Sequence, residues 1–129
     1  MGVRFLSDEY MAEATRIMNE DEQFLSAIEG LDLGMQFTVT DAPGEGEFEY
    51  YIRIADGRGE MARGTLNDPD ARIRNSYETA AGISRGEINS ATAFMTGKLK
   101  VSGNVAKLMM AQGALSRLQD AMGGIDVDY

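Results

Sequence analysis

Residues 35–57, MQFTVTDAPGEGEFEYYIRIADG, decide the fold class, because two runs of alternating apolar and polar residues flank a turn. Apolar side chains occupy positions 35, 37 and 39 in the first run and positions 48, 50, 52 and 54 in the second. A period of two is typical of a strand with one buried face. Pro43 and the neighbouring glycines indicate the turn, and Asp56-Gly57 is a strong hairpin signal. The sequence therefore predicts an antiparallel meander over residues 34–66.

Helical spacing appears on both sides of this meander. Ser7 is placed to cap a helix whose apolar positions are 10, 14, 17 and 18, and a second apolar set ends at Gly30. After the meander we expect a short strand at 71–74, helices at 77–84 and 91–96, a strand at 98–102 and one helix from 105 to about 122. Asn75 and Glu78 resemble a capping pair for the first of those helices. This order predicts an α+β fold, and residues 1–129 are taken as a single domain.

The amino-acid composition excludes several kinds of catalysis and metal binding. The chain has 129 residues, of which 43% are hydrophobic and 26% charged, as in one soluble globular domain. It contains no Cys and no His, which excludes thiol nucleophiles, Ser-His-Asp hydrolysis and most zinc sites. Nine methionines are an excess, and Met suits apolar surfaces that adapt to what they contact.

Charge is distributed unevenly along the chain. Residues 1–52 hold twelve acids and two bases, whereas residues 53–117 hold ten bases and six acids, within a net charge of −9. An anionic field disfavours nucleic acid, so none is expected as a partner. The termini show no secretory or peroxisomal signal and no apolar run is long enough to span a bilayer, so we expect a cytoplasmic protein without stable membrane insertion.

The last predicted helix is apolar over much of its circumference. Two explanations remain open from its pattern. The helix is either wedged between the sheet and neighbouring helices, or it forms the lid of an internal apolar cavity. In the second case adaptable methionines line the cavity: Met95, Met109, Met110 and Met122.

One segment carries a family resemblance. Thr96-Gly-Lys-Leu-Lys-Val-Ser-Gly-Asn104, preceded by Phe94 and followed by a Met-rich helix, resembles the signature of the sterol carrier protein type-two domain. Gly86, eleven residues before Gly97, and Asp68-Pro-Asp70 match further features of that family. The order of elements over residues 8–122 also fits. The absence of a peroxisomal C-terminal signal and of an attached enzyme domain points to a free-standing prokaryotic relative.

The resemblance implies a five-stranded, mostly antiparallel sheet, covered on one face by helices and enclosing a hydrophobic tunnel. It also implies non-catalytic binding of a fatty acid, acyl-coenzyme A, phospholipid or sterol, with no catalytic residue, cofactor or metal. The candidate cavity residues are Phe37, Val39, Phe48, Tyr50, Ile52, Phe94, Met95, Leu99, Val101, Leu108, Met109, Leu115 and Met122. The motif turns are expected at Gly86, Gly97 and Gly103. Gly97 and Gly103 bracket a short strand, where a sharp turn can exclude a β-carbon.

Two other functions compete with simple carriage. The protein could be an accessory or scaffold protein that presents hydrophobic intermediates to a lipid-metabolising enzyme. It could also be an enzyme that uses Tyr50, Tyr51 or Glu49, but neighbours on a strand point to opposite faces, which disfavours a concerted acid–base pair. Asp68 and Asp70 lack the glycine and terminal Glu of a calcium loop.

Overall fold

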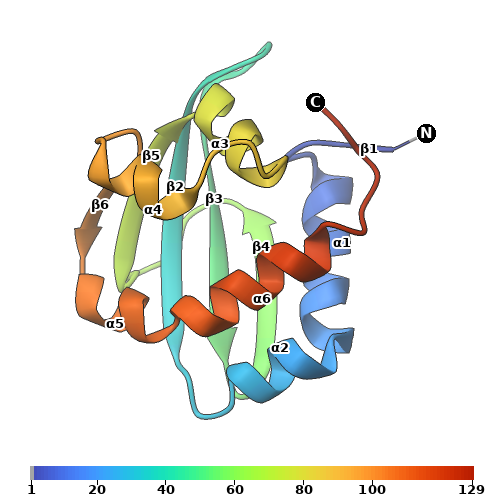
Figure 1. Ribbon diagram of the computed structural model, residues 1–129, viewed down its shortest axis with the longest axis vertical. Helices are drawn as coiled ribbons and strands as arrows, with labels where there is room; N and C mark the ends of the chain where they lie inside the picture. Colours follow the sequence, from blue (N-terminus) through green and yellow to red (C-terminus); the bar gives the residue numbers. More distant parts are fainter. Residues whose placement is uncertain (1) are drawn as a thin grey trace.

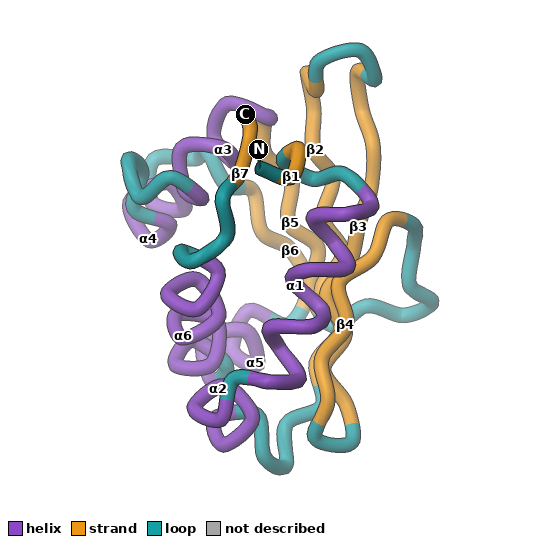
Figure 2. The backbone as a smooth tube through the Cα atoms, turned by 90° about the vertical axis from the view of Figure 1, so that its right-hand side faces the viewer, coloured by secondary structure: helices purple, strands orange, loops and turns teal. Residues whose placement is uncertain are grey.

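The computed structural model describes residues 2–129, and its main element is a five-stranded sheet with the order β4-β3-β2-β5-β6. The strands are β2 (Leu33–Ala42), β3 (Gly46–Ala55), β4 (Arg58–Arg63), β5 (Ala71–Ser76) and β6 (Lys100–Gly103). The neighbours β2 and β5 are parallel, and the other pairs are antiparallel. Figures 1 and 2 show the helices gathered on one face of this sheet. The predicted fold class is confirmed.

The meander that the alternating pattern predicts is formed by β2, β3 and β4. Phe37 pairs with Tyr50 and Val39 pairs with Phe48, so the apolar positions of both runs share one face. Asp56 has φ +54° and Gly57 has φ +73°, as both central residues of a tight type I′ hairpin require. The hairpin signal at Asp56-Gly57 is therefore confirmed.

Two helices begin the chain, and the first protects a sheet edge. In α1 (Asp8–Glu20), Ser7 caps the N-terminus as predicted, and Asp21 separates α1 from α2 (Glu22–Ala27). The Thr15 hydroxyl donates to Met61 O at 3.0 Å and accepts from Met61 N at 2.9 Å. Asn19 makes a similar pair of hydrogen bonds with Gly59. These side chains form hydrogen bonds with backbone N–H and C=O groups at the free edge of β4, which would otherwise be unpaired.

The predicted cap of the next helix is wrong by one residue. Ser76, not Asn75, is the N-cap of α3 (Tyr77–Ser84), because its hydroxyl accepts from Thr79 N at 3.2 Å. Asn75 instead continues the inward alternation of β5, after Ala71 and Ile73. The following helix, α4 (Ser90–Met95), is capped by Asn89.

The single last helix predicted over residues 105–122 is also wrong. The segment divides into α5 (Val105–Met110) and α6 (Gln112–Met122) at Ala111, whose ψ of 2° departs from helical geometry. Ala111 offers α6 no side-chain cap, and Gly113 in its first turn has low helix propensity. The break lets α5 stay beside β6 while α6 crosses in front of the sheet (Figure 1).

A small parallel pair, β1 (Val3–Arg4) with β7 (Val127–Asp128), joins the two ends of the chain (Figure 2). Two-residue strands are too short to show a period, so the sequence did not indicate them. The buried core lies between the sheet and the helices, and its most buried large side chains include Met18, Phe24, Ile28, Leu33, Met35 and Ile54. Within residues 2–129, no helix is both long and apolar enough to cross a membrane.

Candidate functional site: the apolar interior between sheet and helices

The inward face of the central strands provides the first wall of the candidate site. Val39, Tyr50 and Ile52 are buried there, and the rings of Phe37 and Tyr50 stack at 4.6 Å between centroids with an interplanar angle of 2°. Phe37 remains partly exposed although its neighbours on the same face, Met35 and Val39, are 1% and 0% exposed. Solvent therefore reaches an apolar side chain in the middle of the central strand.

A second group of apolar side chains borders the same interior. Its members come from four elements or their ends, pack against the buried core and are each partly exposed. They are Phe48 on β3, Leu99 and Val101 at β6, Leu108 on α5, and Leu115 and Met122 on α6. Together with Phe37 and the three buried strand residues, these account for ten of the thirteen predicted cavity residues, all of them in or against the core.

The other three predicted cavity residues lie at the surface. Phe94 is 48% exposed, Met95 is 84% exposed and Met109 is 66% exposed. The described conformation therefore does not enclose these three side chains. Ala93, the neighbour of Phe94, is 1% exposed and anchors α4.

Two polar side chains interrupt the apolar inward face. Burial raises the pKa of Tyr50, and the nearby Tyr10 adds to that rise. Burial likewise raises the pKa of Tyr10 to about 12, so both hydroxyls stay protonated at neutral pH. Asn75 is 7% exposed, and its Oδ1 has no hydrogen-bond partner among residues 2–129. A buried amide oxygen without a partner is costly, so it marks a position where a ligand atom would be stabilising.

Asn75 is not among the site residues predicted from the sequence. Its spacing did contain the signal, because Ala71, Ile73 and Asn75 alternate along one strand. Asn followed by Glu three positions later is also typical of a helix start, so the local pattern predicts a cap at this position. The register of β2 and β5 shows that Asn75 is a strand residue. It pairs with the fully buried Val39, so its side chain belongs to the inward face.

The residues of the enzyme hypothesis are separated by the sheet. Tyr50 lies on the buried face, whereas the Tyr51 hydroxyl donates to Glu60 at 3.3 Å on the other side. Burial, followed by the charge of Glu60, raises the pKa of Tyr51. Glu49 is exposed and accepts a hydrogen bond from Thr38. Tyr50 and these two neighbours therefore do not share one reaction site.

The Asp68-Pro-Asp70 motif has a structural role at Asp70. One carboxylate oxygen accepts from Gly34 N at 2.7 Å, and the other accepts from Lys107 Nζ at 3.1 Å. The Gly34 hydrogen bond is the largest cause of the lowered pKa of Asp70, and Lys107 adds to it. Within residues 2–129, no group of three or more Asp or Glu side chains is placed to hold a metal ion.

The three motif glycines occupy left-handed turns. Gly86, Gly97 and Gly103 have φ of +77°, +80° and +93°. At Gly103 there is also a close approach: an added β-carbon would lie 2.5 Å from Asp70 O, inside the contact distance of any real β-carbon. Asn104 N donates to this same Asp70 oxygen at 2.7 Å, so the turn after β6 is fastened to the start of β5.

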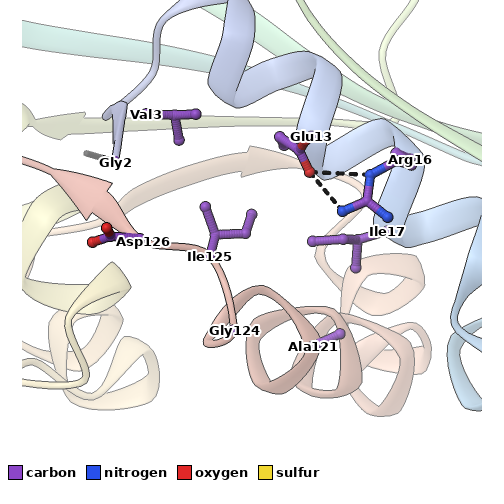
Figure 3. A pocket seen from close by; sticks show the side chains of 9 residues that line it. All are labelled: Gly2, Val3, Glu13, Arg16, Ile17, Ala121, Gly124, Ile125 and Asp126. Carbon is purple, nitrogen blue, oxygen red and sulfur yellow. Dashed lines mark hydrogen bonds and ion pairs between the residues drawn. The ribbon is translucent and has the colours of Figure 1, made fainter.

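Two open surface hollows lie away from the apolar interior. One, of about 470 Å³, is lined by residues of α1, the end of α6 and the chain termini, including Glu13, Arg16 and Ile125 (Figure 3). The other, of about 280 Å³, lies beside the β3–β4 hairpin and includes Asn19 and Arg53. Neither is lined by any of the thirteen predicted cavity residues, so the tunnel stays a prediction.

The sequence matches one protein family and is similar to proteins of known name. The model of the SCP-2 sterol transfer family matches residues 14–116. Sterol carrier protein 2 from Gallus gallus is 31% identical over 97 residues, which cover 75% of this chain and 17% of the relative. A fatty acid-binding protein from Yarrowia lipolytica is 32% identical over 85 residues, covering 65% of this chain and 66% of that protein.

Solved structures agree with the fold. A crystal structure of sterol carrier protein 2 superposes with a TM-score of 0.78 at 18% identity and covers 95% of this chain and 100% of its own. That identity shows the fold alone. The chain spans about a sixth of the length of the Gallus gallus relative, whose full activity therefore does not transfer to it. Because the family model covers most of the chain, the chain belongs to the SCP-2 sterol transfer family.

Proposed function

We propose that this protein binds and carries a hydrophobic ligand, without catalysis, in the apolar interior between the sheet and α5 and α6. The candidate ligands are a fatty acid, an acyl-coenzyme A, a phospholipid or a sterol-like molecule. The observation that carries the proposal is the partial exposure of Phe37 on the inward face of the central strand, against a core that other partly exposed apolar side chains, such as Leu115, also border. A fully packed core would leave no solvent access at such a position.

Burial of an alkyl chain provides the driving force. Each methylene removed from water is worth about 0.8 kcal/mol, so a 16-carbon tail supplies roughly 10 kcal/mol before the costs of binding. The surrounding side chains include Met122 and Leu108, which have enough rotational freedom to fit chains of different shape.

Asn75 gives the interior a polar contact. In this proposal its unpartnered Oδ1 accepts a hydrogen bond from a hydroxyl or N–H at the polar end of the ligand. Replacing it in Asn75→Val removes the buried polar group and should raise the stability of the empty protein by about 1–3 kcal/mol. The same variant should weaken binding of a fatty alcohol about tenfold and leave its methyl ether, which has no donor, unchanged. Equal weakening of both ligands would contradict this role for Asn75.

The ligand-binding proposal is tested by native mass spectrometry of the purified protein and by displacement of a fluorescent fatty acid. Leu115→Trp places a large ring in the interior, whereas Ser116→Trp, one residue further along α6, places it in solvent. We expect Leu115→Trp to weaken displacement by chains of 14 to 18 carbons at least tenfold and Ser116→Trp to leave it unchanged. Failure of the wild-type protein to bind any chain longer than about ten carbons would refute the proposal.

A second role follows from the charge distribution. The acidic residues 1–52 give α1 and its surroundings a surface that could hold the carrier against a basic face of a lipid-metabolising enzyme. Pull-down at low ionic strength should then recover such an enzyme, and recovery should fall as salt is added. Loss of recovery on reversing charges at Glu13 and Glu20 would support the role, and recovery that ignores both salt and these residues would argue against it.

A further inference from the structure

The cations of this chain divide by residue type along the sequence. All three lysines, Lys98, Lys100 and Lys107, fall within ten residues, whereas every other cation is Arg. These lysines belong to residues 88–119, which contain no Asp or Glu although the whole chain carries a net charge of −9. This segment is therefore a cationic island in an acidic protein.

The same segment carries most of the exposed large apolar side chains. Phe94 and Met95 end α4 with 48% and 84% exposure, and Met109 and Met110 end α5 with 66% and 83% exposure. Figure 1 shows α4, β6 and α5 following one another along one side of the molecule. We call this surface the α4–α5 face and define it by Phe94, Met95, Lys98, Lys100, Met109 and Met110.

The charges of the α4–α5 face are available to a partner. Within residues 2–129, the ion pairs include Lys107 with Asp70 but none that involves Lys98 or Lys100. Both free lysines are exposed and flank the start of the edge strand β6. Their neighbours on α4 and α5 are apolar, so the face combines cations with side chains that avoid water.

The acidic helix α1 lies at the opposite edge of the sheet. In the strand order, β6 ends one side and β4 ends the other, and α1 packs along β4. This helix carries Asp8, Glu9, Glu13 and Glu20, against the single cation Arg16. With Arg58, Glu60 and Arg63 of β4 added, this edge has five acids and three cations, so an anionic surface would favour the β6 edge over the β4 edge and orient the molecule.

We propose that the α4–α5 face docks the protein peripherally on anionic phospholipid membranes. Met95, Met109, Met110 and Phe94 enter the head-group region, while Lys98 and Lys100 contact phosphates. The use of Lys favours a lipid surface over a protein partner, because protein interfaces are enriched in Arg and depleted in Lys. An acidic protein partner is the alternative that the experiment must separate.

The test is sedimentation with vesicles of phosphatidylcholine alone or with 30% phosphatidylglycerol, at about 50 mM salt. Lys98→Gln with Lys100→Gln removes the two free cations of the face. Arg4→Gln with Arg58→Gln is the matched control, since it gives the same net charge but removes exposed, unpaired cations elsewhere. Each lysine near an anionic surface is worth about fivefold in partitioning, so the lysine double variant should bind roughly 25-fold more weakly and the arginine control about as well as wild type.

A third variant, Met95→Gln with Met110→Gln, tests the apolar contact. Both side chains are more than four-fifths exposed, so thermal unfolding should match wild type while vesicle binding falls at least tenfold. Lysine dependence without methionine dependence would overturn the contact of the methionines with the head-group region and leave a purely electrostatic attraction. The proposal is also refuted if wild type ignores phosphatidylglycerol or if the arginine control loses as much binding as the lysine variant.

The docking proposal stands apart from ligand carriage. Vesicle sedimentation reports the surface, and displacement of a fluorescent fatty acid in solution reports the interior. Normal ligand displacement without vesicle binding would refute the docking proposal alone, and vesicle binding without ligand displacement would refute carriage alone.

Discussion

The turn at Gly103 combines a positive φ with a close approach of backbone atoms, so one added methyl group should be costly there. In Gly103→Ala the new β-carbon would lie 2.5 Å from Asp70 O and 3.1 Å from Ala71 Cα. Both obstacles are backbone atoms, which cannot rotate away as a side chain would. The backbone must therefore shift at the point where Asn104 N donates to Asp70 O and β6 pairs with β5.

The matched control Gly97→Ala separates the cost of the close approach from the cost of the positive φ. Gly97 also has a positive φ of +80°, but no atom lies within 4 Å of its added β-carbon. An alanine forced into the left-handed region costs roughly 1–2 kcal/mol, and this is the whole expected effect at Gly97. Overlap with packed backbone adds about 1–3 kcal/mol at Gly103, for a total of about 2–5 kcal/mol.

The assay is urea unfolding followed by circular dichroism, with the free energy of unfolding extrapolated to water. Gly103→Ala should be less stable than Gly97→Ala by about 2 kcal/mol, with the same dependence of the free energy on urea concentration. Equal stability of the two variants would refute the reasoning, because it would mean that the close approach to Asp70 is relieved without cost.

Three further perturbations test the supports of the fold. The hydrogen bond from Arg117 and then that from Phe24 N lower the pKa of Asp21 from 3.8 to about 2, so the stabilisation from its carboxylate is complete above about pH 4 and is lost as pH falls through 2. The variant Asp21→Asn should lose this pH-dependent component in acid unfolding, which fluorescence of a bound dye would follow. An unchanged acid-unfolding profile would contradict it. Gln36→Leu removes hydrogen bonds with the backbone of Tyr50, Gly64 and Leu66 and should cost about 3 kcal/mol in urea unfolding. A loss below about 1 kcal/mol would show that these backbone groups find other partners. Thr15→Val keeps the shape of the side chain but leaves the backbone N–H and C=O of Met61 without their hydrogen bonds to it. Amide hydrogen exchange at β4 should then accelerate at least tenfold. Exchange at the wild-type rate would count against protection of this edge by α1.

Local pattern determined much of the fold. Alternation over residues 35–54 and the Asp56-Gly57 turn were enough to predict the β2–β4 meander, because strand period and turn chemistry are properties of neighbouring residues. Ser7 was recognised as a cap for the same reason. The family resemblance rested on another local feature, the segment 96–104, and the match over residues 14–116 confirms it.

The tertiary structure decided what local pattern leaves open. Asn75 fits a cap by sequence, but pairing with Val39 places it in β5 with an unsatisfied oxygen. The last helix breaks at Ala111, which is buried where the chain turns from the β6 edge onto the sheet face. These outcomes depend on contacts between segments far apart in the chain.

The sequence by itself determined the composition of this protein: no Cys or His, excess Met, and an acidic start followed by a segment without acids. It could not place those charges in space. Packing of α1 along β4 and of α4 and α5 beside β6 separates them to opposite edges of one sheet. The physical reason is strand order, which arises from long-range pairing and which residue order alone does not specify.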